Sequence, residues 1–266
     1  MPIIDQLFTT LRSQNRKALM PFVTAGDPDL HFTADVLKEL SKRGANLFEV
    51  GIPYSDPIAD GPVIQASYTR ALDKGVKLAD ILSMLGETAP QLSPPVVTMV
   101  SYAIIYRHGL ERYADDARAA GVSGLIVPDL PVEESSQLAA ICAKRELSLI
   151  QLVTPTTPRD RALRICATST GFVYYVSVAG ITGERRDLPA ELVDNVGWLR
   201  EQTKLPICIG FGISTPEHVK LLAPVADGLI VGSAIVRRIA VAATKPRDEV
   251  LRDVGDYVAS LIEVLK

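Results

Sequence analysis

Glu49 and two nearby aspartates are the side chains best suited to acid–base chemistry. Glu49 lies within the apolar segment LFEVGI (47–52). The following segment PYSDPIADGPVIQAS (53–67), which its three prolines predict to be a stiff loop, contains Asp56 and Asp60. Two carboxyl groups in different surroundings can divide the work, because a buried one stays protonated near neutral pH while a solvated one stays ionised. Each residue also has a structural interpretation: Glu49 as a hydrogen-bonded strand residue, and each aspartate as a turn residue before Pro or Gly.

Two glycine-rich turns could hold a phosphate group. GFGIS (210–214) contains Gly210 and Gly212, and VGSAIV (231–236) contains Gly232 and Ser233. Glycine allows close approach of the backbone, and Ser233 as the cap of a following helix would leave N–H donors and its hydroxyl facing an anion. Each glycine alone is also consistent with an ordinary turn.

The segments that must position these residues are short apolar runs alternating with amphipathic stretches. Their spacing of about 33 residues is typical of a βα unit, and runs that are apolar on both faces are typical of parallel strands under helices. The eight runs are 18–25, 47–52, 96–102, 124–130, 147–153, 171–178, 205–211 and 227–233. Helical patterns occupy 29–43, 108–120, 133–145, 158–168, 189–202, 215–223, 233–241 and 247–264.

This alternation predicts an α/β fold, a single (β/α)8 TIM barrel over residues 1–266 with an extra N-terminal helix. No Pro-, Gly- or Ser-rich linker divides the chain. The alternative is an open doubly wound sheet, which would need a nucleotide-binding loop after its first strand; PFVTAGDPD (21–29) lacks the G-x-G-x-x-G pattern. In a barrel, functional side chains are expected at the carboxyl ends of the strands.

Alternation along 47–52 predicts where Glu49 points. Phe48, Val50 and Ile52 share one face of an extended chain, and Leu47, Glu49 and Gly51 share the other. We expect the bulky apolar face to pack under the helices, so that Glu49 projects into the barrel. Burial there would raise the pKa of Glu49, as a general acid or base near neutral pH requires.

Composition excludes several classes of function. The chain has 266 residues, 28 Lys and Arg against 31 Asp and Glu, and 47% hydrophobic residues. This is ordinary globular usage, and the slightly acidic balance argues against a nucleic-acid partner. There is no apolar run of 18 residues, so no membrane span is expected, and the first residues do not resemble a signal peptide. Three widely spaced cysteines suggest a reduced, cytoplasmic setting, and no metal is expected from the scattered histidines; these residues are Cys142, Cys166, Cys208, His31, His108 and His218.

The block FEVGIPYSDPIADGPVIQAS (48–67) strongly resembles the signature of tryptophan synthase alpha subunits. Further matching motifs cover most of the chain: PFVTAGDPD, GLIVPDLPVEES (124–135), AGITG (179–183), GFGIS and GSAIV (232–236). The resemblance implies a lyase of tryptophan biosynthesis that cleaves indole-3-glycerol phosphate by a retro-aldol reaction to indole and glyceraldehyde 3-phosphate. It implies that Glu49 is the acid/base at indole C3 and that Asp60 accepts the indole N–H.

The resemblance also implies the other binding residues. Tyr174 matches a tyrosine near the substrate, although Tyr175 is a one-residue alternative. The loop 177–189 resembles a lid that brings Thr182 toward Asp60. An apolar slot for the indole is expected from Phe22, Val100, Ile126, Phe211 and Ile230, and a phosphate site from Gly183, Gly210, Gly212, Gly232 and Ser233.

The family assigns no cofactor to this chain. Pyridoxal phosphate (PLP) is expected in a partner beta subunit, in an alpha2-beta2 heterotetramer that docks on the active end of the barrel around 53–61. Two alternatives stay open: a barrel isomerase or synthase acting on a related sugar phosphate, and a binding or activating subunit with vestigial chemistry. The first should lack the SDPIADGP block, and the intact pair Glu49 and Asp60 argues against the second.

Overall fold

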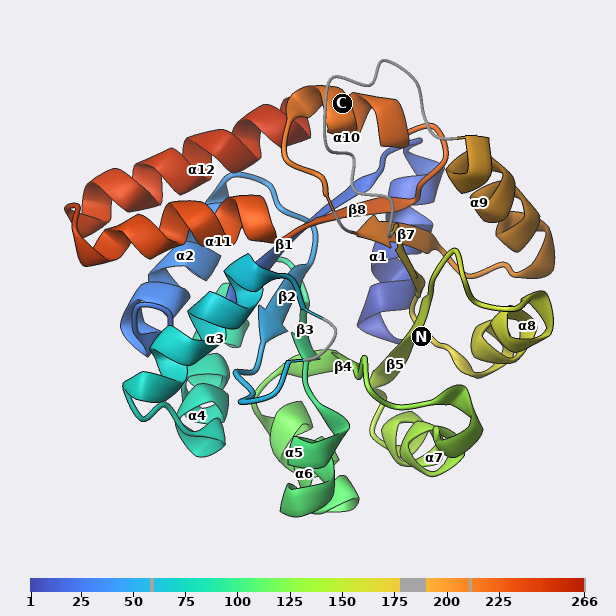
Figure 1. Ribbon diagram of the computed structural model, residues 1–266, viewed down its shortest axis with the longest axis horizontal. Helices are drawn as coiled ribbons and strands as arrows, with labels where there is room; N and C mark the ends of the chain where they lie inside the picture. The colour runs from blue at the N-terminus through green and yellow to red at the C-terminus, as the bar shows by residue number, and fades with distance from the viewer. Residues whose placement is uncertain (58–59, 178–189, 211, 266) are drawn as a thin grey trace.

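Eight parallel strands close into a barrel (Figure 1). The computed structural model describes residues 1–57, 60–177, 190–210 and 212–265. The strands follow chain order around the barrel, and β8 pairs with β1 from Ala18↔Gly228 to Pro21↔Val231. They are β1 (Ala18–Thr24), β2 (Phe48–Gly51), β3 (Val96–Met99), β4 (Val122–Ile126), β5 (Ser148–Val153), β6 (Val173–Val176), β7 (Ile207–Gly210) and β8 (Gly228–Val231). The predicted TIM barrel is confirmed, and closure rules out the open doubly wound sheet.

Helices surround the barrel in the order that a repeated βα unit requires. The α-helices are α1 (Ile3–Ser13), α2 (Leu30–Lys42), α3 (Pro62–Asp73), α4 (Leu78–Thr88), α5 (Tyr102–His108), α6 (Leu110–Ala119), α7 (Ser136–Lys144), α8 (Arg159–Thr168), α9 (Ala190–Gln202), α10 (Pro216–Leu222), α11 (Ser233–Ala240) and α12 (Arg247–Glu263). Short 3₁₀ turns are η1 (Ala89–Gln91), η2 (Val132–Glu134) and η3 (Val241–Ala243). In the described part of the chain, no helix is long and apolar enough to cross a bilayer.

The segment 53–67, expected to be a loop, becomes helical at Pro62. Gly61 occupies the N-cap of α3 and Pro62 the first helical position. Proline fits there because its missing N–H would have no partner within the helix. The loop that follows β2 is therefore shorter than expected, and α3 begins two residues after Asp60.

Two apolar clusters divide the core. The outer cluster lies between strands and helices and includes Phe48, Val50 and Ile52. The inner cluster fills the barrel and includes Leu47, on the same strand face as Glu49. The predicted orientation of residues 47–52 is thus confirmed. Members of the inner cluster are Ile4, Phe8, Leu11, Ala18, Met20, Phe22, Leu47, Ile64, Tyr68, Val97, Met99, Ile126, Ile150, Phe172, Tyr174, Cys208, Ile230 and Val236.

Helix α1 closes the amino end of the barrel. Its buried residues Ile4, Phe8 and Leu11 belong to the inner cluster, and the ring of Phe8 lies 5.9 Å from that of Phe172, just before β6. In Figure 1 this helix lies behind the strands, so the carboxyl end faces the reader. The interior that Glu49 enters is therefore sealed below by apolar side chains.

Candidate active site

Glu49 is a buried carboxyl group on the inward face of β2. It pairs in register with Phe22 of β1 and Val97 of β3, both apolar, and only 1% of the residue is exposed. Among the described residues, neither of its carboxyl oxygens has a hydrogen-bond partner. Burial of an unpaired negative charge is so unfavourable that such a group stays protonated. The structural interpretation of Glu49, a carboxylate hydrogen-bonded within its strand, finds no support among these residues.

Asp60, rather than Asp56, is the second carboxyl group of the site. Asp56 is exposed and accepts a 2.6 Å hydrogen bond from the hydroxyl of Ser55. Asp60 is partly buried, its N–H donates to the carbonyl of Pro57 at 3.3 Å, and its carbonyl accepts from Gln65 Nε2 at 2.8 Å. These backbone contacts tie Asp60 to the first turn of α3 and leave its carboxyl group for chemistry.

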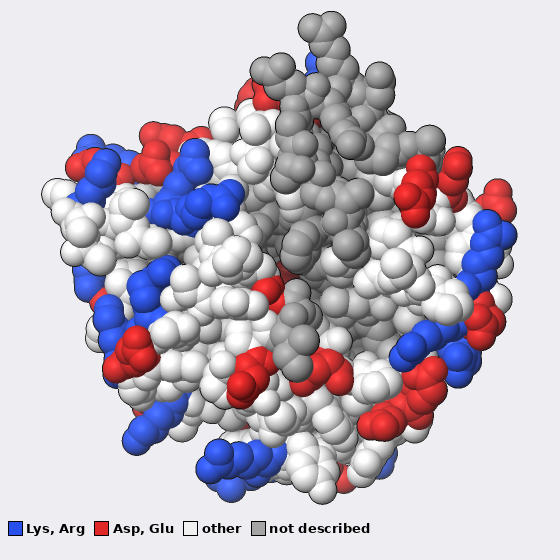
Figure 2. All heavy atoms as spheres, in the orientation of Figure 1, with Lys and Arg blue, Asp and Glu red and all other residues white. Residues whose placement is uncertain are grey.

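The two carboxyl groups have separated acidities. Burial, followed by the negative charge of Asp60, raises the pKa of Glu49 to about 8. Burial alone raises the pKa of Asp60 to about 6. At pH 7 Glu49 is therefore mainly protonated and Asp60 mainly ionised, which is the division expected of a proton donor beside an electrostatic stabiliser. In the space-filling view, acidic side chains reach nearest the centre of this face, and Lys and Arg lie toward its rim (Figure 2).

Tyr174, and not Tyr175, faces the barrel interior. Tyr174 belongs to the inner cluster and Tyr175 to the outer one, which resolves the one-residue alternative. Burial raises the pKa of Tyr174 well above its ordinary value, and the charges of Glu49 and Asp60 add to this effect. A Cβ at Gly210 would overlap the Tyr174 hydroxyl, so the tyrosine needs the glycine beside it.

Most of the expected apolar slot lies on the inward face of the barrel. Phe22, Ile126 and Ile230 belong to the inner cluster. Val100 is a correction: it belongs to the outer cluster, because alternation along β3 gives the inward position to its neighbour Met99. Met99 is thus an inward-facing candidate for the slot that was not predicted, although the alternation of 96–100 would have identified it.

The expected phosphate-binding turns follow β7 and β8. Gly210 ends β7, and Gly212 has a φ of 77°, a left-handed conformation that favours glycine. Gly232 follows β8 directly, and a Cβ there would lie 3.6 Å from the Cβ of Phe22. The two turns therefore follow neighbouring strands at the carboxyl end of the barrel.

The prediction that Ser233 caps α11 is wrong. Gly232 is the N-cap residue and makes no side-chain bond, while Ser233 is the first helical residue. The carbonyl of Gly232 accepts the N–H groups of Ile235 at 2.9 Å and Val236 at 3.0 Å. N–H groups at the start of a helix have no partner within it, so those of Ser233 and Ala234 are suited to an anion.

Three expected site residues, Thr182, Gly183 and Phe211, lie outside the described residues, as does the lid segment from residue 178 to 189. Tyr68 is a second site residue that was not predicted. It belongs to the inner cluster and comes from α3, a helix that no helical pattern in the sequence analysis covered. The helical spacing of Ile64 and Tyr68, both inward, was the available signal.

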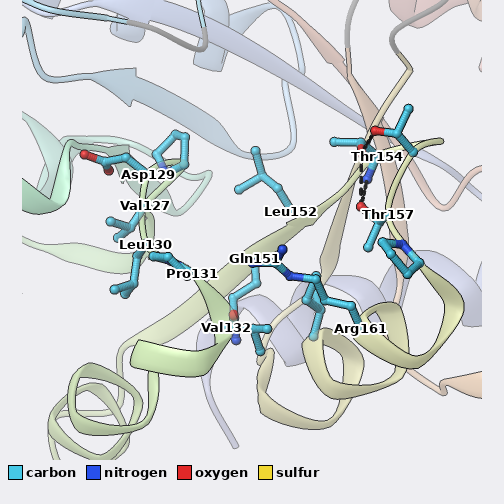
Figure 3. A pocket seen from close by; sticks show the side chains of 14 residues that line it. Val127, Asp129, Leu130, Pro131, Val132, Gln151, Leu152, Thr154, Thr157 and Arg161 are labelled. Atoms are coloured by element: carbon cyan, nitrogen blue, oxygen red, sulfur yellow. Dashed lines mark hydrogen bonds between the residues drawn. The ribbon is translucent and has the colours of Figure 1, made fainter.

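A cavity of about 340 Å³ lies beside the carboxyl ends of β4 and β5, outside the group of residues around Glu49 (Figure 3). Gln151 within it donates to Thr168 of α8 at 2.6 Å, and Arg161 pairs with Glu133 at 3.0 Å. These polar groups already have partners, so the cavity does not replace the carboxyl pair as the candidate site. Its lining residues are Val127, Pro128, Asp129, Leu130, Pro131, Val132, Gln151, Leu152, Thr154, Thr156, Thr157, Pro158, Arg161 and Ile165.

Comparisons with known proteins agree over nearly the whole chain. A family model described as tryptophan synthase alpha chain matches residues 8–260. The tryptophan synthase alpha chain of Rhodopirellula baltica is 58% identical over 275 aligned residues, which cover 100% of this chain and 99% of the relative. The alpha chain of Synechocystis is 48% identical, covering 90% of this chain and 91% of the relative.

Solved structures agree as well. Tryptophan synthase subunit alpha from Legionella pneumophila superposes with a TM-score of 0.91 at 36% identity, covering 100% of this chain and 98% of the other. A chain of the tryptophan synthase complex from Pyrococcus furiosus gives a TM-score of 0.84 at 36% identity, with coverages of 93% and 98%.

Proposed function

The chain belongs to the tryptophan synthase alpha chain family, and we propose that Glu49 and Asp60 carry out the reaction of that family. As a member, the chain is a carbon–carbon lyase that cleaves indole-3-glycerol phosphate in tryptophan biosynthesis. One observation supports this assignment of residues: the Glu49 carboxyl group is buried without a hydrogen-bond partner among the described residues, near enough to Asp60 for that charge to raise its pKa further.

The retro-aldol reaction needs a proton donor first. Glu49 gives its proton to indole C3, and the ring becomes a positively charged indoleninium. The carboxylate of Asp60 accepts the indole N–H and stabilises the charge that develops at N1. These two roles require one neutral and one ionised carboxyl group.

Cleavage then needs a base. The Glu49 carboxylate takes the proton of the hydroxyl on the adjacent glycerol carbon, whose C–O bond becomes the aldehyde C=O. The electron pair of the broken carbon–carbon bond returns to the ring and restores neutral indole. Glu49 ends the cycle protonated, so no outside acid or base is consumed.

We propose that the remaining residues hold the two ends of the substrate. Phe22, Ile126, Ile230 and Tyr174 surround the indole, supported by their place in the inner cluster. The turns at Gly210, Gly212, Gly232 and Ser233 take the phosphate, supported by the start of α11 at Ser233, where the first N–H groups have no partner within the helix. Thr182, Gly183 and Phe211 stay predictions for the same two sites.

Assembly with a beta subunit is a further proposal. Similar structures include a tryptophan synthase complex. We infer an alpha2-beta2 heterotetramer in which the partner holds PLP and this chain has no cofactor of its own, with the partner docked around residues 53–61. Three free, buried cysteines support a reduced, cytoplasmic setting.

The test is indole release from indole-3-glycerol phosphate by the purified chain. Glu49→Gln should lower the rate by about 10²–10⁴-fold and leave ligand binding nearly intact. Glu134→Gln, at an exposed position of η2, is the matched control and should keep the parental rate. Parental turnover by the Glu49 variant would remove Glu49 from the mechanism.

A further inference from the structure

The side chain of Tyr68, which belongs to α3, lies against the inward face of β2 at Gly51, two residues beyond Glu49. Only 3% of this residue is exposed. A Cβ placed on Gly51 would lie 2.8 Å from the Tyr68 hydroxyl and 2.5 Å from Cζ of Phe22. The ring of Phe22 from β1 and the hydroxyl of Tyr68 from α3 therefore approach the same side of the Gly51 backbone.

Gly51 shares its strand face with Glu49. Residues two apart on a strand are about 6.6 Å apart and point the same way. Gly51 is also the last residue of β2, on the side of the open end of the barrel. The ring of Phe22 and the side chain of Tyr68 consequently lie beside Glu49 on the inward face of β2, on the side of the open end.

Polar contacts on either side of Tyr68 fix its position. The hydroxyls of Ser67 and Thr24 lie 2.6 Å apart, which joins α3 to β1. Arg70 donates from Nε and Nη2 to the two carboxyl oxygens of Asp27 at 2.9 and 2.6 Å. Because Asp27 is only 2% exposed, this bidentate pair holds α3 firmly against the end of β1.

We propose that Tyr68 is a positioning residue for Glu49: its ring, together with Phe22, covers the inward face of β2 and excludes water from the carboxyl group. The proposal rests on the assignment of Glu49 as proton donor. The aromatic ring of Tyr68, rather than its hydroxyl, excludes water from the Glu49 carboxyl group.

In the part of the chain that the structure describes, the surroundings of Glu49 combine three titratable side chains with apolar neighbours. The titratable ones are Asp60 from the loop after β2, Tyr68 from α3 and Tyr174 from β6. The neighbouring strands contribute Phe22 and Val97, which carry no charge. Burial is the largest cause of the raised pKa of Glu49, ahead of the charge of Asp60, so removal of the cover should lower that pKa.

The experiment follows the carboxylic-acid C=O band of Glu49 by infrared spectroscopy as a function of pH. The Glu49→Gln spectrum identifies the band by difference. Tyr68→Phe keeps the ring and should leave the midpoint near that of the parent. Tyr68→Gln admits water and should lower the midpoint by about one pH unit or more. The base-side limb of the kcat/KM profile should move with the band.

Tyr113→Gln is the matched control, because Tyr113 is equally buried but belongs to the outer cluster. If Tyr68→Gln does not fold, Tyr68→Leu is the substitute: its smaller apolar side chain covers less of Glu49 and should lower the midpoint of the Glu49 band by a smaller amount. An unchanged midpoint in a folded Gln or Leu variant overturns the proposal. Equal shifts in the Phe and Gln variants overturn it too, because they would assign the effect to the hydroxyl. The band is independent of turnover, so failure of Glu49 as proton donor would be seen separately.

Discussion

Replacement of Glu49 by glutamine should stabilise the folded chain, increasingly so as the pH rises. The pKa of Glu49 is about 8 in the folded state, against an ordinary value of 4.5. A raised folded-state pKa means that the contribution of this group to stability is fully present below pH 4.5 and is lost as the pH rises toward 8. Glutamine has nearly the same shape and does not titrate, so the variant escapes that loss.

The magnitude follows from the two pKa values. Each pKa unit corresponds to about 1.4 kcal/mol. At pH 7 the unfolded parent gains about 3 kcal/mol by ionising Glu49, whereas the folded parent gains almost nothing. At pH 5 the same gain is only about 1 kcal/mol. The stability of Glu49→Gln relative to the parent should therefore increase by about 2–3 kcal/mol between pH 5 and pH 7.

Urea denaturation at pH 5, 6 and 7 measures this difference. Any pH-independent effect of the amide cancels, because only the change with pH is compared. Asp227→Asn is the control: burial raises the pKa of Asp227, but the N–H of Ile207 and two arginines outweigh burial and hold it below its ordinary value. Its difference from the parent should stay constant over this range. A constant difference for Glu49→Gln would mean that Glu49 is ionised in the folded protein, and would refute the proposed donor.

Three further outcomes are expected. The kcat/KM profile of the parent should be bell-shaped, with limbs near pH 6 and pH 8 from Asp60 and Glu49; a flat profile across this range would contradict the assignment. Asp60→Asn should lower kcat/KM by about 10²–10³-fold and abolish the acid limb; retention of that limb would assign it elsewhere. Gly210→Ala should raise KM several-fold in steady-state assays, because the added Cβ would overlap the Tyr174 hydroxyl. Gly197→Ala in α9 is the control, since its Cβ would meet nothing within 4 Å, and it should leave KM unchanged. Equal KM values for the two variants would contradict the role given to Gly210.

The sequence predicted the barrel well because buried parallel strands have a strong signal. Each of the eight apolar runs overlaps an observed strand, and seven of them contain it whole; β4 begins at Val122, two residues before the run 124–130. Helices α3, α4 and α5 were missed. For α3 and α4, prolines and aspartates before residue 62 favour a loop, and the amphipathic pattern afterwards is interrupted by polar residues. Helix α5 has only 7 residues, too few for a clear helical periodicity. That the whole chain is one domain stays a prediction.

The site was predicted unevenly. Alternation was sufficient for Glu49, whose strand has one bulky and one mixed face. Val100 was misplaced because its position was inferred by resemblance and not by counting along β3. The spacing of Ile64 and Tyr68 indicates an inward helix face, but it does not show that Tyr68 lies against Gly51, 17 positions earlier in the sequence, because that proximity joins a helix to a strand.

Helix α1 is synthesised first but can dock only near the end of synthesis. Arg12 donates to Asp227, 215 residues later, and to the carbonyl of Lys204. At about 5–20 residues per second, a ribosome needs roughly 10–40 s to make the intervening chain. During that interval Ile4, Phe8 and Leu11 have no barrel to enter. A nascent chain that stops before β8 consequently cannot close the barrel between β8 and β1, and it has no barrel interior against which α1 can pack. In ribosome-bound chains of increasing length, α1 should therefore become protected from protease only once β8 has emerged.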